Sequence, residues 1–153
     1  MTSYSFFEGF GHYTEQMMLD EGFGGNDPKL RLFQLKAALQ RICRYIVGIK
    51  MHTEMMSIQE AIEFFISNAY MERVNAEREA MRGTIDPMYL AYTLGKLQVL
   101  KLREDYRKFK RSGYSLREFH DNLLSYGYPP VKILRMITLP GDNEKESAVD
   151  LSI

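Results

Sequence analysis

Three side chains able to bind a metal lie close together near the start of the chain, in the stretch FFEGFGHYTEQMM at residues 6–18. Glu8, His12 and Glu15 are spaced four and three residues apart, so on a helix they share one face. A carboxylate and an imidazole at this spacing can bind the same metal ion, but zinc takes three or four protein ligands. Spacing alone therefore favours a structural or surface role, with a metal or catalytic site as the alternative.

The other two histidines do not complete a known ligand pattern. His52 is expected at the C-terminal end of a helix, where the helix dipole favours a cationic side chain. His120 follows Phe119 in an apolar segment and is expected in the core or at its boundary. The motif H-E-x-x-H is absent, as are a glycine-rich phosphate loop and a nucleophile elbow.

The elements that carry these residues are all predicted to be helices. Asp27 and Asp86 each stand as a capping residue before a proline, and Ser57 and Ser115 each begin a capping box. No segment alternates with the period of two that is typical of a strand. The expected fold class is all-α, with six or seven helices of unequal length in a compact multi-helix domain. The expected helices span residues 4–21, 28–52, 58–69, 72–82, 87–111, 116–127 and 131–137.

Two patterns predict how these helices pack. Apolar residues three and four positions apart predict an apolar stripe on the second helix: Leu32, Leu35, Leu39, Ile42, Ile46 and Ile49. Gly95 lies in the middle of the helix expected to be the longest, which predicts that another helix or a ligand approaches its backbone closely. Residues 1–138 are predicted to form a single helical domain, and the polar residues 139–153 a disordered tail.

The composition argues against several classes of protein. The 20 basic residues are balanced by 20 acidic ones, so the basic face that binds nucleic acid is not expected. No signal peptide is visible, and no apolar run reaches the length of about 18 residues needed to cross a membrane. The single cysteine, Cys43, is expected to be a buried thiol. The default expectation is a soluble, cytoplasmic protein that binds neither nucleic acid nor a membrane.

Several motifs, in this order, resemble one bacterial family. They are EGFGHYTEQMML at 8–19, DPKLRL at 27–32, MHT at 51–53, YTLGKL at 92–97, LRE at 102–104 and FHDNLL at 119–124. The chain resembles the bacterial domain of unknown function 885 from about residue 7 to residue 134. Members of that family are usually much longer, with a helical fold similar to zinc metallopeptidases of the gluzincin type. In such proteins an H-E-x-x-H helix supplies two histidine ligands and the general base.

The resemblance implies roles for particular residues. Glu8 would be the third zinc ligand, in an E-G-F variant of the family's E-G-W. His12 and Glu15, on the same helix face, would support that ligand through hydrogen bonds. The side chains implied to hold or polarise a peptide substrate are His52, Tyr92 and Arg103.

The chain departs from the family pattern because it has no H-E-x-x-H sequence. The other two zinc ligands and the catalytic glutamate would lie upstream of residue 1, so we expect this chain alone to bind no zinc. The implied function is the C-terminal helical domain of a zinc metallopeptidase-like protein, inactive in isolation. It would supply the third metal ligand and part of the cleft for a peptide substrate, and be completed by a missing N-terminal region or a partner chain.

Two other interpretations stay open. The first is a non-catalytic interaction module, because a domain that lacks part of its fold exposes apolar surface and can form homo-oligomers. Met17, Met18 and Leu19 would contribute to that surface. The second is a free-standing helical enzyme that binds a metal at a dimer interface through Glu8 and its two neighbours on the same face.

Overall fold

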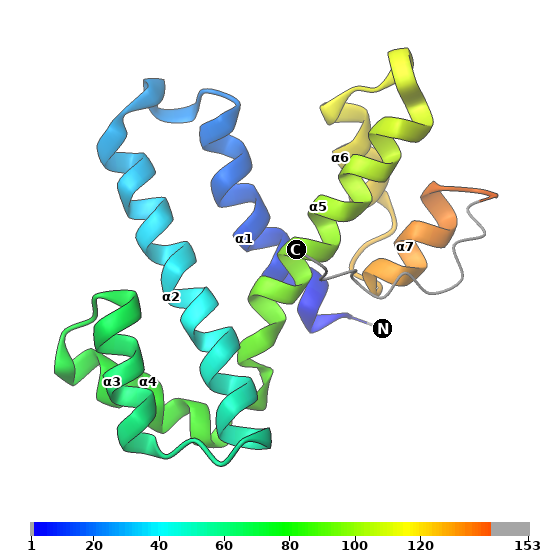
Figure 1. Cartoon of the computed structure of the whole chain (residues 1–153). Coiled ribbons are helices and arrows are strands. Elements are labelled where there is room, and N and C mark those ends of the chain that lie inside the picture. The colour runs from blue at the N-terminus through cyan, green and yellow to red at the C-terminus, as the bar shows by residue number, and fades with distance from the viewer. Residues whose placement is uncertain (1, 142–153) are drawn as a thin grey trace. The chain divides into compact units, whose positions relative to one another are not determined.

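The computed structural model describes residues 2–141 and has seven α-helices in that range, with no strand (Figure 1). The α-helices are α1 (Tyr4–Asp20), α2 (Pro28–Thr53), α3 (Ile58–Ala69), α4 (Arg73–Ile85), α5 (Ala91–Lys110), α6 (Leu116–Ser125) and α7 (Val131–Thr138). Short 3-10 turns connect some of them: η1 (Phe23–Asn26), η2 (Pro87–Leu90) and η3 (Arg111–Gly113). The predicted all-α fold is confirmed. The predicted disordered tail falls largely on residues 142–153, which lie outside the described residues.

The predicted capping residues begin the helices as expected. Asp27 accepts a hydrogen bond from the backbone of Lys29 at the start of α2, and Asp86 accepts one from Met88 at the start of η2. Ser57 forms a complete capping box with Glu60 at the start of α3. These bonds satisfy backbone N–H groups that the first turn of a helix leaves without partners. The longest helix is α2, with 26 residues against 20 in α5, so that detail of the prediction was wrong.

The chain divides into two compact units. The first comprises the described parts of Met1–Tyr13 and Gly95–Ile153, and the second is Thr14–Leu94. Two helices, α1 and α5, contribute residues to both units. The prediction of one domain over residues 1–138 stays a prediction.

The core of the second unit forms where α2 packs against α3, α4 and η2. Cys43 and Val47 of α2 are buried against Phe65 of α3, Ala80 of α4 and Tyr89 of η2. The predicted burial of the Cys43 thiol is therefore confirmed, and burial raises the pKa of that thiol. Much of the remaining core consists of alanines, which let the helices approach closely.

The predicted apolar stripe of α2 is not buried in the core of the second unit. Leu32, Leu35 and Ile42 are 65%, 54% and 42% exposed, and the other three residues of the stripe are half-buried. The residues that α2 does bury lie elsewhere on its surface: Gln34, Ala38, Cys43, Val47 and Gly48. The helix period identified an apolar face correctly, but residues 2–141 cover it only in part.

In the first unit, α1 and α5 cross at two glycines. A Cβ atom on Gly95 would lie 2.9 Å from the Cα of Gly9 and would overlap the backbone of Ser5. A Cβ atom on Gly9 would lie 2.6 Å from the backbone nitrogen of Lys96. No side chain fits between these backbones. The predicted close approach at Gly95 is therefore confirmed, and the approaching element is helix α1.

Candidate functional site

The three candidate metal-binding residues of α1 lie in different environments. His12 is buried, Glu8 is half-buried and Glu15 is exposed. Both carboxylate oxygens of Glu15 accept hydrogen bonds from Arg41 of α2, each at 2.7 Å. Within residues 2–141, no three His, Cys, Asp or Glu side chains lie close enough to hold a metal ion. These three residues therefore do not form a metal site by themselves.

The Glu8 carboxylate has no hydrogen bond or ion pair with any other residue in the described range. It lies one turn before His12 on the same helix, next to the tightly packed Gly9. Because α1 and α5 are in backbone contact there, the position of the Glu8 backbone is held firmly. A carboxylate in this state is able to bind a cation, or to accept a hydrogen bond, from a group outside residues 2–141.

Tyr92, a predicted substrate-binding residue, lies beside a polar cluster in the second unit. Arg44 of α2 donates two hydrogen bonds, of 2.7 and 2.6 Å, to the carboxylate of Glu79 on α4. The Tyr89 hydroxyl donates to the backbone oxygen of Glu79 at 2.9 Å. Arg82 hydrogen-bonds Tyr92, and the Arg44 guanidinium lies 6.0 Å from the centre of the Tyr92 ring. Two cations therefore flank the Tyr92 side chain.

The charges of this cluster stabilise one another. Burial by itself raises the pKa of Glu79, but the hydrogen bonds and charge of Arg44 outweigh it and lower the pKa below the usual value. Burial and the adjacent Glu79 carboxylate raise the pKa of Tyr89 well above its usual range, so its hydroxyl stays protonated. The cluster is thus an ion pair with a neutral tyrosine donor. Sequence spacing did not reveal it, because Arg44 and Glu79 are 35 residues apart.

Lowering the pH is expected to remove the stabilising contribution of Glu79. Its pKa is lower in the folded state than the ordinary value of 4.5, so folding favours the ionised carboxylate. That contribution is complete above pH 4.5 and is lost as the pH falls through the folded-state pKa. Urea unfolding of the wild type and of Glu79→Gln should give a difference in unfolding free energy that is largest near pH 7 and shrinks below pH 4.5. A difference that stays constant to pH 3 would contradict this assignment.

His52 approaches the same part of α4. Its Nε2 atom lies 2.9 Å from the backbone oxygen of Gly83, so Nε2 carries the proton and donates it. Tyr92 contacts Arg82, the residue before Gly83. His52 and Tyr92 therefore form hydrogen bonds with successive residues of α4, Gly83 and Arg82. The His52 side chain is exposed.

Arg103 lies in the first unit, in a cluster that spacing did not predict. It donates a hydrogen bond of 3.3 Å to the Tyr13 hydroxyl, which also lies 2.8 Å from Nε2 of His120. Burial by itself lowers the pKa of Arg103, but hydrogen bonds to Tyr13 and Tyr114 raise it above the usual value. No carboxylate within the described chain pairs with Arg103. Its charge is therefore available to an anionic group.

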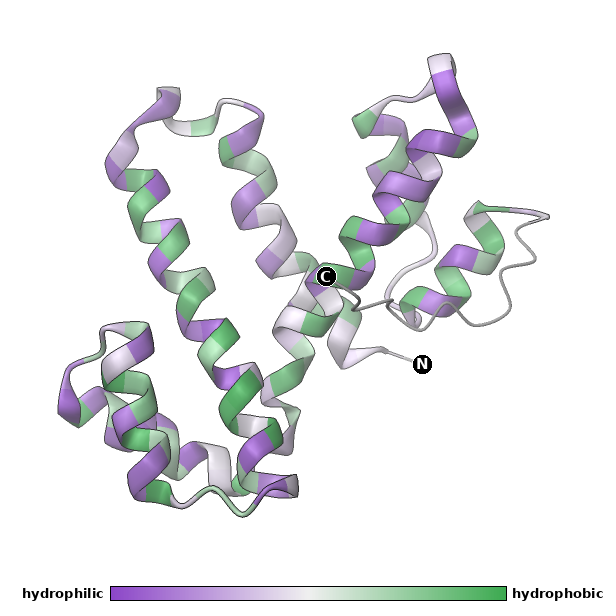
Figure 2. Ribbon diagram, in the orientation of Figure 1, coloured by the Kyte–Doolittle hydropathy of each residue, from purple (hydrophilic) through white to green (hydrophobic). Residues whose placement is uncertain are grey.

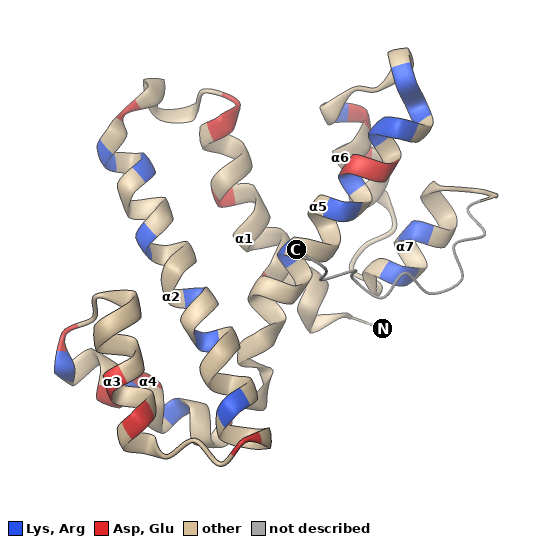
Figure 3. Ribbon diagram, viewed as in Figure 1, with Lys and Arg blue, Asp and Glu red and all other residues tan. Residues whose placement is uncertain are grey.

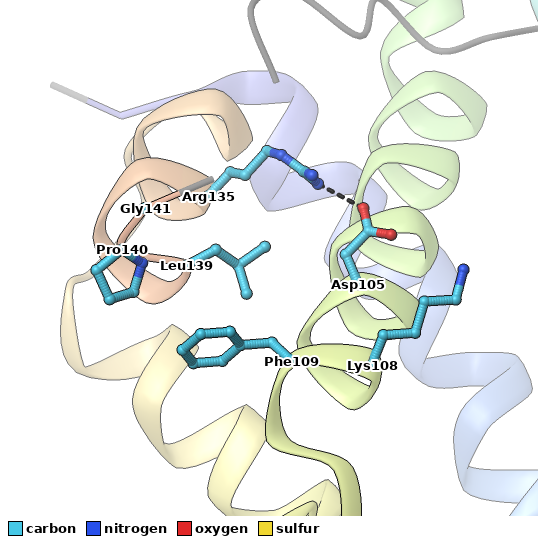
Figure 4. Close-up of a pocket in the computed structure, with 7 residues that line it drawn as sticks. All are labelled: Asp105, Lys108, Phe109, Arg135, Leu139, Pro140 and Gly141. Carbon is cyan, nitrogen blue, oxygen red and sulfur yellow. Dashed lines mark hydrogen bonds and ion pairs between the residues drawn. The ribbon is translucent and has the colours of Figure 1, made fainter. Parts of the chain in front are cut away.

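A pocket of about 290 Å³ opens beside α5 and α7 in the first unit (Figure 4). Its lining residues are Asp105, Lys108, Phe109, Arg135, Leu139, Pro140 and Gly141. The carboxylate of Asp105 is bound by Lys101 at 2.8 Å and by Arg135 at 2.5 Å. Burial raises the pKa of Asp105, but these two cations outweigh it and lower the pKa overall. A carboxylate held by two cations is a poor general base, so Asp105 is not a candidate catalytic base.

Two solved structures are similar to this chain over most of its length. One is described as a "putative lipoprotein of unknown function" from Shewanella oneidensis, with a TM-score of 0.85 and 33% identity. The match covers 90% of this chain but 26% of that one. The other, described as a "putative lipoprotein" from Colwellia psychrerythraea, has a TM-score of 0.83 and 29% identity, over 88% of this chain and 23% of that one. This chain thus spans about a quarter of each neighbour.

The location of the protein and its family are considered separately. No described helix of this chain is both long and apolar enough to cross a membrane. Because both neighbours are described as lipoproteins, the expected cytoplasmic location stays a prediction. No curated protein matches the chain. The model of a family described as "Bacterial protein of unknown function (DUF885)" matches residues 1–137, and the chain therefore belongs to that family.

Proposed function

We propose that this chain forms the C-terminal helical part of a zinc metallopeptidase-like fold, in which Glu8 supplies one metal ligand. The observation that supports this proposal is the state of the Glu8 carboxylate, which is half-buried without a hydrogen bond or ion pair to residues 2–141. Removing a carboxylate from water without a partner costs free energy unless a cation compensates for it. A metal ion would provide that charge.

The residues of this chain do not fit a complete zinc site. Zinc needs three or four protein ligands, and no such group exists among the described residues. The H-E-x-x-H sequence is also absent from the chain. The other ligands and a general base would have to come from polypeptide outside this chain, so we expect no hydrolysis by the chain in isolation.

The substrate in this proposal is a peptide. Arg103, a cation without a carboxylate partner in the described range, would bind a carbonyl oxygen or carboxylate of that peptide. Within the second unit, Tyr92, which contacts Arg82, would donate a hydrogen bond to a peptide, and His52, whose Nε2 donates to Gly83, would accept one through Nδ1. His12, buried one turn after Glu8, would support the metal ligand, whereas Glu15 is already bound by Arg41.

The neighbour from Shewanella oneidensis offers a direct test, because it contains the matched region within a much longer chain. Zinc content would be measured by mass spectrometry for that protein and for the alanine variant at the position aligned with Glu8. We expect bound zinc in the wild type and a loss of about tenfold or more in affinity in the variant. A matched control is the alanine variant at the position aligned with Glu15, whose zinc content should change less. Zinc content that does not depend on the Glu8 position would contradict the proposal.

The second candidate function is a non-catalytic interaction or oligomerisation module. The observation in its favour is the exposed apolar surface of the second unit, which includes Met18 of α1 and the partly covered stripe of α2. Of the three α1 residues expected to contribute, Met17 and Leu19 are half-buried. This function requires no role for Glu8, so the zinc measurement separates the two candidates.

A further inference from the structure

The geometry of α2 points to a docking surface, and we propose that it binds an amphipathic helix with acidic flanks. That helix would belong to the part of the family fold that lies outside the region matched by this chain. The surface, called the α2 stripe, consists of Leu32, Leu35, Leu39, Ile42, Ile46 and Ile49. This inference concerns a protein partner and does not depend on the metal proposal.

The α2 stripe has the form of a helix-packing face. Its residues step by three and four positions over 18 residues, which corresponds to about 27 Å of helix. Half of them are exposed and none is buried, although Cys43 and Val47, which adjoin the stripe on the same helix, pack into the core. Apolar residues recur along the whole length of α2 (Figure 2). A continuous apolar face of this length is typical of a protein–protein contact.

The charges beside the α2 stripe indicate the chemistry of the partner. All charged residues of α2 are basic, as Figure 3 shows: Lys29, Arg31, Lys36, Arg41, Arg44 and Lys50. The three arginines pair with carboxylates of α1 and α4. Lys29, Lys36 and Lys50 share one edge of the helix, at separations that are multiples of seven residues.

That row of lysines is largely unpaired. Lys29 and Lys36 form no ion pair with residues 2–141, and Lys50 reaches Glu54 only at 3.9 Å. A partner helix with Glu or Asp beside its apolar face would pair with this row. A second copy of the chain would instead place α2 against another helix that has only basic charges. Charge complementarity therefore favours a different, acidic helix over self-association.

The solved neighbours indicate where such a helix is found. Matches that cover 90% and 88% of this chain cover only 26% and 23% of the neighbours. With TM-scores of 0.85 and 0.83, most of this chain's helical fold recurs within a larger chain in both neighbours. The remaining polypeptide of that larger fold is the source that we assign to the partner helix.

The first experiment compares the same change in two proteins. Leu32→Gln combined with Leu35→Gln is made in this chain, and glutamines are placed at the aligned positions of the full-length Shewanella oneidensis protein. In this chain both leucines are more than half exposed, so Tm should change by no more than about 1 °C. In the longer protein, where the partner helix would cover them, Tm should fall by about 5 °C or more. A fall of equal size in both proteins, or in neither, would overturn the inference.

The second experiment tests the charge of the partner with synthetic peptides. Two labelled amphipathic helices share one leucine face and differ only in having glutamates or lysines beside it. Fluorescence anisotropy should show that this chain binds the glutamate peptide at least about tenfold more tightly, and that Leu32→Gln/Leu35→Gln abolishes the difference. The control is Val74→Gln/Met81→Gln, which alters two exposed residues of α4 and should leave binding unchanged.

Sedimentation equilibrium of the chain alone tests whether a second copy of the chain binds the α2 stripe instead. A monomer at concentrations used for the peptide experiment is the expected result. A dimer that the Leu32→Gln/Leu35→Gln variant dissociates would overturn the inference, because a second copy would then occupy the α2 stripe. Equal affinity for the two peptides would also overturn it.

Discussion

Replacing Gly95 with alanine is expected to lower Tm by about 10 °C or more. The added Cβ atom would lie 2.9 Å from the Cα of Gly9 and would overlap the backbone of Ser5. Because both neighbours are backbone, no side chain can rotate away, and the two helices must separate. The corresponding loss of unfolding free energy is about 3–5 kcal/mol, measured by thermal or urea unfolding.

Gly11 provides the matched control for this prediction. It lies on α1 two residues after Gly9, and a Cβ atom built there meets no atom within 4 Å. Gly11→Ala should stabilise the protein by up to about 1 kcal/mol, because alanine has the higher helix propensity. A Gly95→Ala variant as stable as Gly11→Ala would mean that α1 and α5 do not pack as closely as described.

Removing the Arg44 side chain is expected to cause the second large loss of stability, about 3 kcal/mol. The side chains of Arg44 and Glu79 are only 15% and 16% exposed, so Arg44→Ala leaves the Glu79 carboxylate without its main partner in a poorly hydrated position. Denaturant unfolding at pH 7 measures the effect. Arg44→Lys should recover only part of the loss, because an ammonium group cannot reproduce the two hydrogen bonds.

The control for Arg44 is Lys50, on the same helix. Lys50 and Glu54 lie 3.9 Å apart, and both side chains are about half exposed. Because solvent screens such pairs, Lys50→Ala should change the unfolding free energy by less than about 0.5 kcal/mol. Similar losses for Arg44→Ala and Lys50→Ala would show that the Arg44–Glu79 pair is not a structural ion pair of the second unit.

Local sequence signals predicted most of the fold. Capping residues identified the starts of α2, α3 and α6 to the residue, because a cap acts within a few positions along the chain. Gly95 revealed a close approach, because glycine inside a helix costs stability unless another element needs the space. The end of α4 was predicted at residue 82, but the helix continues through Gly83 to Ile85. Gly83 is buried there beside Tyr89 and Met51, so its role is in packing.

The candidate site was predicted less well, because its contacts join residues far apart in the sequence. The hydrogen bond between Tyr13 and His120 joins positions 107 residues apart, and helix periodicity does not indicate which distant residues meet. Arg103 was predicted to bind the substrate, but its contact with Tyr13 was not predicted. Whether the α2 stripe is covered could not be predicted for a related reason. A periodic pattern shows which face of a helix is apolar, but the element that covers the face is encoded elsewhere.

The most direct test of the central claim, that this chain supplies one part of a metal site completed by other polypeptide, is zinc calorimetry on the chain itself. The wild type and Glu8→Ala would be titrated side by side. We expect no tight binding in either, because one carboxylate is too few ligands for zinc. Tight binding by the wild type that is lost in Glu8→Ala would contradict the claim, because the chain would then form a complete zinc site of its own.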